Sequence, residues 1–245
     1  MKRILTVFVC MLFVLSISAC GSGRQLSGTN ANPTPQPEIN PESQTFSEPG
    51  QGVPDDAGTD RVLVAYFAYS ENMGDTSGMS VDAVTSASLN RDTANTEGNL
   101  QVMAQEIIEK KGGEVFSILM QEPFDPDYST MLGGAIEQIQ NGTLPPLQSR
   151  IEDMGQYDVV FLGIPVWSNE IPPAVRTFLT ENDLSGKTIV PFGIHLGSRF
   201  GKMINQIEEL CPDADILDGF TVNASTANEE VRTQVNEWLD TLEMP

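Results

Sequence analysis

The sequence is poor in cysteine, histidine and positive charge. Its 245 residues include 3 cysteines and 1 histidine. Lys and Arg number 13 against 34 Asp and Glu, which gives a formal net charge of −21. Nucleic acid is excluded as a partner, because no basic patch is available to neutralise phosphates. The acidity by itself favours solubility, and a basic protein partner stays open as an alternative.

Three sequence motifs of nucleotide and acyl chemistry are missing as well. No Gly-Lys-Ser/Thr follows a glycine loop, which excludes a Walker site, and no GxGxxG marks a dinucleotide-binding turn. A serine hydrolase that uses Ser70 is a weak alternative. No GxSxG sequence exists, and the one histidine, His195, would have to serve as the base.

The first twenty residues have the pattern of an export signal. A basic start precedes an apolar run over 4–17, which is too short for a comfortable membrane span. Residues 17–20, Ile-Ser-Ala-Cys, resemble the lipobox of bacterial lipoproteins, in which the cysteine is acylated and becomes the new N-terminus. The resemblance implies a lipid on Cys20 and an extracytoplasmic protein anchored to the bacterial cell membrane. The alternative is an ordinary secreted protein cut near Ala19.

The expected organisation has three parts. Residues 1–20 are the lipoprotein signal peptide, residues 21–60 a disordered tether, and residues 61–245 one folded domain. The tether contains too few large apolar residues to offset its ordering entropy, whereas the third part is long enough for a full core. Once the signal is removed and Cys20 acylated, Cys211 alone remains, so we expect no internal disulfide. A buried structural thiol is favoured over a reactive one there.

In the folded part, short apolar runs alternate with helical patterns. The runs predict strands over 62–69, 114–120, 157–164, 187–194 and 214–222. Helical spacing predicts helices over 99–111, 127–141, a segment opened by Pro172-Pro173, 199–210 and a last segment capped by Asn228. This alternation predicts an α/β fold with a parallel sheet between two helical layers. Pro191 removes a ladder donor inside the fourth strand, so we expect a local bulge there.

Three segments follow predicted strands at the edge where ligands bind in such sheets: 70–99, 165–171 and 195–201. In the first, Thr96, Gly98 and the unpaired N–H groups of a helix start can hold a phosphate without a cation. A polar N-cap turn with no ligand is the alternative.

The other two segments each contain one conspicuous ring. An exposed Trp167 would be costly unless it stacks on a ligand; the alternative is a core tryptophan that covers the end of the sheet. His195 is followed by Gly197 and Gly201, which let the backbone approach a flat ligand closely. The alternative for His195 is a structural or solvent-exposed histidine.

Together these segments resemble the flavodoxin family, in its long-loop, flavodoxin-like branch. The resemblance covers roughly residues 61 to 242 and rests on VLVAYFAYS, TEGN, VVFLGIPVWSNEIPPAVRTFL and SGKTIVPFGIHLGSRFG. It implies a flavodoxin-like, doubly wound five-stranded parallel sheet of order 2-1-3-4-5 in three α/β/α layers. It also implies FMN as the cofactor.

The resemblance assigns cofactor contacts by position. The phosphate contacts would be Ser70, Thr96, Glu97, Gly98 and Asn99. The ring would be bordered by Pro165, Val166, Trp167 and Ser168, with Trp167 as the stacking partner, and on its other side by His195, Gly197, Ser198 and Gly201. In two departures, Leu100 replaces a threonine of the phosphate motif and Ser168 a second tryptophan. The insertion over 71–95 is either a flap over the flavin or a surface excursion.

The function implied is that of an FMN-binding lipoprotein in electron transfer at the cell envelope, with a redox protein or a small quinone as partner. One alternative is an NAD(P)H-dependent FMN quinone reductase, in which His195 or Arg199 orients the quinone. Another is a lipoprotein that binds its ligand without turnover. No acid–base dyad is evident, so no catalytic residue is assigned.

Overall fold

The computed structural model describes residues 61–74, 98–125, 127–167 and 169–244. All of these residues belong to one compact unit that extends over Asp55–Pro245. The signal, the tether and most of the insertion lie outside the described residues, so the three-part organisation stays a prediction. Within the described ranges, no helix has both the length and the apolar content that a bilayer crossing needs.

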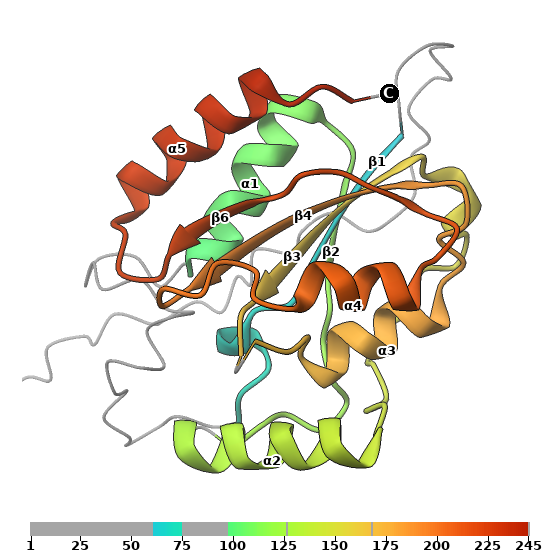
Figure 1. Cartoon of the computed structure of the whole chain (residues 1–245), viewed down its shortest axis with the longest axis vertical. Helices are drawn as coiled ribbons and strands as arrows, with labels where there is room; N and C mark the ends of the chain where they lie inside the picture. Colours follow the sequence, from blue (N-terminus) through green and yellow to red (C-terminus); the bar gives the residue numbers. More distant parts are fainter. Residues whose placement is uncertain (1–60, 75–97, 126, 168, 245) are drawn as a thin grey trace, which may run out of the picture. The chain divides into compact units, whose positions relative to one another are not determined.

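A parallel sheet of order β2-β1-β3-β4-β5 forms the centre of the domain (Figure 1). Its strands are β1 Val62–Tyr66, β2 Glu114–Ser117, β3 Val159–Pro165, β4 Thr188–His195, β5 Asp215–Ile216 and β6 Phe220–Asn223. Strands β1 and β3 are buried along their whole length, as expected for strands covered on both faces. The predicted flavodoxin-like fold and its strand order are confirmed.

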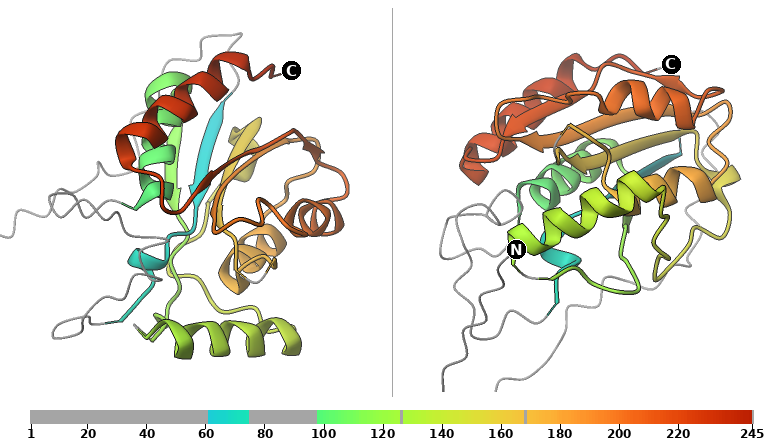
Figure 2. Two further views of the ribbon diagram at one scale, coloured as in Figure 1. Left: turned by 60° about the vertical axis from the view of Figure 1, so that its left-hand side comes forward. Right: turned by 60° about the horizontal axis from the view of Figure 1, so that its bottom comes forward.

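Helices cover both faces of this sheet (Figure 2). They are α1 Asn99–Lys111, α2 Tyr128–Asn141, α3 Pro173–Glu181, α4 Met203–Leu210 and α5 Asn228–Thr241. Side chains alternate along β1, so Leu63 and Ala65 join the core shared with α2, α3 and α4. Val62 and Val64 join the second core, shared with α1 and α5.

The bulge expected at Pro191 is present, but it lies in the neighbouring strand. Thr188 pairs with Asp215 and Phe192 pairs with Phe220, so the edge strand gains one residue between these two pairs. The predicted strand 214–222 is therefore split into β5 and β6, which both pair with β4. Pro191 can occupy the interior of β4 because its neighbour bends past the missing donor.

Two predicted helix starts need correction. The fourth helix begins at Met203 and not at Arg199, because the four residues before Met203 form turns. In the last helix the N-cap is Ala227, and Asn228 is the first helical residue. The weaker pattern over 127–141 does form α2, which Asp127 caps by accepting a hydrogen bond from the Thr130 N–H at 2.8 Å.

Candidate functional site

The carboxyl edge of the sheet brings together the segments that follow β1, β3, β4 and β6. Val166 N–H donates to Ile194 O at 2.9 Å, which joins the segments after β3 and β4. Ala224 N–H donates to His195 O at 2.8 Å, which joins those after β4 and β6. Thr96, Glu97 and Ser168 lie outside the described residues, so their predicted roles stay predictions.

Ser70 and Asn99 both present a buried polar atom to this edge. Ser70 lies in a short 3-10 helix, Tyr69–Glu71, directly after β1, and Asn99 is the first residue of α1. Neither Ser70 Oγ nor Asn99 Oδ1 has a hydrogen-bond partner within the described ranges. A buried polar atom without a partner is costly, so both atoms point to a polar ligand.

The Asn99 amide also connects the two ends of the domain. Its Nδ2 donates to Ala224 O and Thr226 O, each at 3.3 Å, in the segment between β6 and α5. These two contacts fix the amide orientation and leave Oδ1 as an acceptor. This segment was not predicted to contribute to the site, although a parallel sheet places the end of its last strand at the same edge as the others.

Gly98 caps α1, and its N–H group already has a partner. The Gln101 side chain accepts that N–H at 2.7 Å, and Gln101 Nε2 donates to Glu71 Oε1 at 2.6 Å. Tyr66 and Ser117 also donate to the Glu71 carboxylate. Burial and the nearby Glu71 carboxylate raise the pKa of Tyr66 well above its usual range. Glu71 therefore places a negative charge close to the predicted phosphate position.

Buried Asn72 holds the segment after β1 in place. Its Nδ2 donates to Ala68 O at 2.9 Å and to Ile118 O at 3.0 Å, and its Oδ1 accepts from Met120 N–H at 2.8 Å. The side chain is 2% exposed and uses both polar atoms. Ser70 thus lies on a turn that a satisfied internal network positions.

Trp167 lies inside the core and not at the surface. Its ring is 6% exposed and makes edge-on contacts with Phe67, Tyr69 and Phe124 at centroid distances of 5.4, 5.9 and 5.6 Å. This is the arrangement of the core alternative, in the core on the sheet face opposite α1. Stacking of Trp167 on a flavin stays a prediction, and it would require the ring to leave this cluster.

His195, the last residue of β4, is partly exposed and oriented by its own loop. Gly197 N–H donates to His195 Nδ1 at 2.7 Å. Partial burial, with the nearby Arg199 guanidinium as a second cause, lowers the pKa of His195 below its ordinary value. The imidazole is therefore neutral at neutral pH, with its proton on Nε2 as a donor.

The loops after β3 and β4 contain unusual backbone conformations. Asn169 and Arg199 have positive φ angles of 64° and 50°, and Gly197 and Gly201 have 126° and 56°. A Cβ at Gly201 would lie 2.6 Å from Asn169 Oδ1, so the two loops are in direct contact. A non-glycine residue in the left-handed region costs free energy, and such residues concentrate at functional sites.

The remaining predicted residues differ in exposure. Pro165, the last residue of β3, is buried, Val166 is half-buried, and Ser198 is exposed. Leu196 was not predicted, yet it is 66% exposed directly after His195. No periodicity could have identified Leu196, because its exposure depends on the turn that begins at Gly197.

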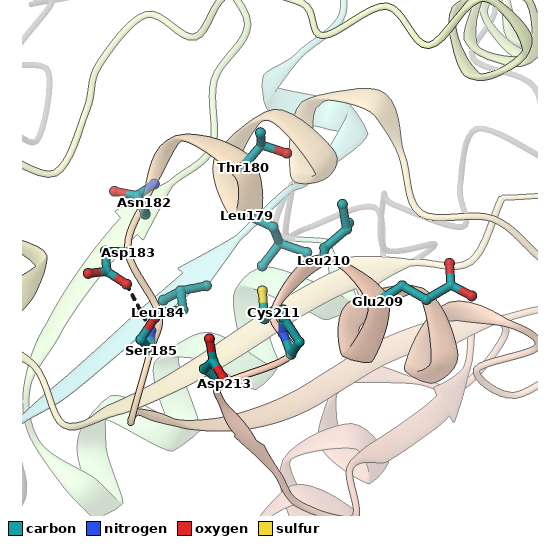
Figure 3. A pocket seen from close by; sticks show the side chains of 11 residues that line it. Leu179, Thr180, Asn182, Asp183, Leu184, Ser185, Glu209, Leu210, Cys211 and Asp213 are labelled. Atoms are coloured by element: carbon teal, nitrogen blue, oxygen red, sulfur yellow. Dashed lines mark hydrogen bonds between the residues drawn. The ribbon is translucent and has the colours of Figure 1, made fainter.

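A cavity of about 280 Å³ lies at the opposite edge of the sheet, between the ends of α3 and α4 (Figure 3). Leu184, Cys211 and Asp213 are among its lining residues. Cys211 is buried as predicted, and burial raises the pKa of its thiol to about 11. None of the predicted site residues lines this cavity.

A family model described as flavodoxin matches residues 93–242, which is more than half of the chain. The chain belongs to the flavodoxin family. No curated protein matches this flavodoxin-family chain. Family membership supports FMN as its cofactor.

Solved structures share the fold. A Bacteroides eggerthii protein assigned as a flavoprotein is 24% identical, with a TM-score of 0.54, and the match covers 76% of this chain and all of that one. A Bacteroides uniformis protein with the same assignment is 20% identical, with a TM-score of 0.54 and coverage of 75% and 99%. A Lactobacillus acidophilus flavoprotein in complex with FMN is 19% identical, with a TM-score of 0.50 and coverage of 74% and 99%.

The residues at the carboxyl edge fit a flavin nucleotide. The first N–H groups of α1 lack intrahelical acceptors and suit a phosphate. The unpartnered Ser70 hydroxyl can donate to an anion, and the unpartnered Asn99 Oδ1 can accept from a ligand hydroxyl. The Glu71 carboxylate opposes an anion at this position, so binding there relies on neutral donors.

Proposed function

We propose that this flavodoxin-family protein binds FMN at the carboxyl edge of its sheet and transfers electrons at the cell envelope. The observation that carries the proposal is the pair of buried, unpartnered polar atoms, Ser70 Oγ and Asn99 Oδ1, beside the start of α1. The bound flavin would supply the redox chemistry, while the protein fixes its position and surroundings.

The chain's own residues have defined tasks in this proposal. Ser70 and the first turn of α1 hold the phosphate, and Asn99 orients a hydroxyl of the ribityl chain. His195 offers an Nε2–H donor at the end of β4. The Asn72 network holds the Ser70 turn ready for binding, so little conformational entropy is lost when the ligand arrives.

The first test is to purify the full chain, add FMN and record the visible spectrum after removal of unbound flavin. A stoichiometric flavin spectrum is the expected result, and a colourless protein would refute FMN binding. If NADPH alone bleaches the bound flavin rapidly, the quinone reductase alternative replaces electron carriage. Reduction only by dithionite or a partner protein supports electron carriage.

The proposed location rests on the signal pattern and Cys20. We propose that lipid on Cys20 holds the domain outside the cell membrane. Labelling with an alkyne fatty acid should mark the wild-type chain and not Cys20→Ser, which should appear in the medium or the soluble extract. Label that persists in the variant would refute lipidation at Cys20.

A further inference from the structure

The start of α1 offers a phosphate fewer donors than a free helix start would. Gln101 Oε1 already accepts the Gly98 N–H at 2.7 Å, so the N–H groups that lack an intrahelical acceptor are those of residues 99–101. The basic side chains of α1 lie in its last turn, at residues 110–111. The first turn of α1 therefore adds no side-chain cation to its remaining N–H groups.

The Glu71 carboxylate is separated from this position by one side chain. Gln101 connects the two, because its Nε2 donates to Glu71 Oε1 at 2.6 Å while its Oε1 accepts from Gly98. Tyr66 OH donates to Glu71 Oε1 at 2.9 Å, and Ser117 Oγ donates to Oε2. These three donors are neutral, so they orient the carboxylate without cancelling its charge. Glu71 therefore repels an anion that approaches the start of α1.

Four segments of the domain hold this carboxylate in place. Tyr66 ends β1, Ser117 ends β2, Gln101 belongs to the first turn of α1, and Glu71 ends the short 3-10 helix after β1. Burial and, second, the Glu71 carboxylate raise the pKa of Tyr66 well above its usual range, so its hydroxyl stays a neutral donor. Moving the carboxylate away from α1 would break hydrogen bonds to three other elements, so its charge is a fixed part of the site.

The two buried polar atoms at this edge suit hydroxyl groups better than a phosphate. Ser70 Oγ and Asn99 Oδ1 have no hydrogen-bond partner within the described ranges. Asn99 Oδ1 can only accept, and a phosphate dianion offers only acceptors, so the two cannot pair. A ligand hydroxyl can donate to Asn99 Oδ1, and it can either donate to or accept from Ser70 Oγ. Both atoms are therefore satisfied by a polyhydroxyl chain.

We propose that this site binds riboflavin nearly as tightly as FMN, and that Glu71 is the residue that sets this low discrimination. The ligand class is a flavin with a polyhydroxyl side chain, with or without a terminal phosphate. Hydrogen bonds from the N–H groups of residues 99–101 to a phosphate are offset by repulsion from Glu71, so the phosphate adds little net affinity. The inference rests on the proposed function, because it extends the ligand range of the same site.

The first measurement needs no variant. Quenching of flavin fluorescence by the full chain gives the dissociation constants of FMN and riboflavin at low salt and about pH 8, where the phosphate is fully ionised. We expect the two constants to lie within about tenfold of each other. Riboflavin that binds more than about tenfold more weakly than FMN would overturn the inference.

Glu71→Gln tests the residue itself, because it removes the charge and keeps the size of the side chain. We expect FMN to bind about three- to tenfold more tightly and riboflavin to change by less than about twofold. Riboflavin binding also shows that the variant is folded. An unchanged affinity for FMN in Glu71→Gln would overturn the role of Glu71.

Two further variants separate the charge of Glu71 from its hydrogen bonds. Ser117→Ala removes one donor of the network and keeps the charge, so it should affect both flavins equally. Glu209→Gln is the matched control for charge, because this exposed residue near the end of α4 lines the cavity at the opposite edge. An equal gain in FMN affinity in Glu209→Gln and Glu71→Gln would overturn the inference. So would a selective gain for FMN in Ser117→Ala.

Failure of the proposed function has a different signature. If the chain binds neither flavin, FMN binding is refuted and the inference with it. If the chain binds FMN and discriminates strongly against riboflavin, the proposed function stands and only the inference fails.

Discussion

At the residue scale, Asn99 combines a structural and a binding role in one amide. Its Nδ2 satisfies Ala224 O and Thr226 O, and its Oδ1 faces the candidate site. Asn99→Asp removes both donor contacts and adds a negative charge at the predicted phosphate position. We expect the FMN dissociation constant to rise at least about tenfold, measured by quenching of flavin fluorescence.

Asn182→Asp is the control for this change. Asn182 caps α3 at the opposite edge of the sheet and donates to Phe178 O at 2.8 Å. The two variants make the same chemical change, so their difference reports on the site. Equal FMN affinity in both would contradict the role given to Asn99.

His195 gives the domain a dependence on pH with a defined sign. Its pKa is lowered in the folded state, so the unfolded chain binds the proton more readily. The stability from neutral His195 is therefore present above the ordinary pKa of about 6.5 and is lost as the pH falls through the folded-state value. Protonation of Nδ1 would also break its bond with Gly197 N–H.

His195→Asn retains an acceptor for Gly197 N–H but does not titrate. We expect urea unfolding of this variant to lose less stability than wild type between about pH 8 and about pH 5. Carboxylates titrate in both proteins, so only the difference between the two profiles counts. If the two proteins lose stability in parallel, His195 contributes nothing to the pH dependence of the free energy of unfolding.

Individual contacts were the least predictable part of the site. The sequence placed Trp167 at the correct edge, but the choice between ligand stacking and core packing depended on Phe67, Tyr69 and Phe124, which come from distant segments. Thr96, Gly98 and the start of a helix likewise indicated a phosphate turn in the sequence. They gave no sign that Gln101 occupies the Gly98 N–H group.

At the element scale, the split edge strand depends on one glycine. A Cβ at Gly219 would lie 2.2 Å from Pro191 O. We expect Gly219→Ala to lower the free energy of unfolding by about 1–3 kcal/mol through overpacking. Gly133→Ala, in α2 with no atom within 4 Å of its Cβ, should instead raise it by about 0.5–1 kcal/mol. Urea unfolding measures the free energy of unfolding of both variants. A loss of stability in both would contradict the steric explanation.

Helices α1 and α5 are joined by a largely buried carboxylate. Glu106 is 8% exposed and accepts from Arg232 Nη1 at 2.5 Å and Asn236 Nδ2 at 2.6 Å. We expect Glu106→Ala to cost about 1–3 kcal/mol of unfolding free energy, because two partly buried donors lose their acceptor. Glu109→Ala, on the exposed face of α1, should change stability by less than about 0.5 kcal/mol. A similar effect of both variants would refute this interpretation.

Element order was predictable, whereas element boundaries were not. Apolar runs identified the position of every strand, although the last run forms two strands, β5 and β6, and β2 at the edge of the sheet is exposed or half-buried. The start of α4 at Met203 was missed, since helical spacing continues through Arg199 while the left-handed φ angles of Arg199 and Gly201 prevent a helix there. Pro191 correctly predicted an irregular strand pairing. It did not predict that the extra residue lies in the neighbouring edge strand, between β5 and β6.

At the scale of the whole molecule, repulsion between the many acidic side chains destabilises the folded state. The whole chain has a formal net charge of −21, and salt screens the resulting repulsion over about 10 Å at 0.1 M ionic strength. We expect the melting temperature to rise with added sodium chloride, measured by circular dichroism. A fall on adding salt would mean that ion pairs such as Arg61–Asp158 outweigh the general repulsion.

The edge that contains the candidate site was predictable because parallel strands share a direction. Segments 70–99, 165–171 and 195–201 were assigned to one edge from their order alone. The contribution of Ala224 and Thr226 could not be predicted. They contact Asn99 through backbone carbonyls, which every residue has, so their side chains give no signal.

The Asn99 amide reaches a carbonyl 127 positions further along the chain. During synthesis, the first helix therefore emerges long before the backbone that orients its leading side chain. The proposed FMN site is therefore complete only once the chain has been made through Thr226, just before α5. We expect a ribosome-stalled chain that ends before Thr226 to leave FMN in solution.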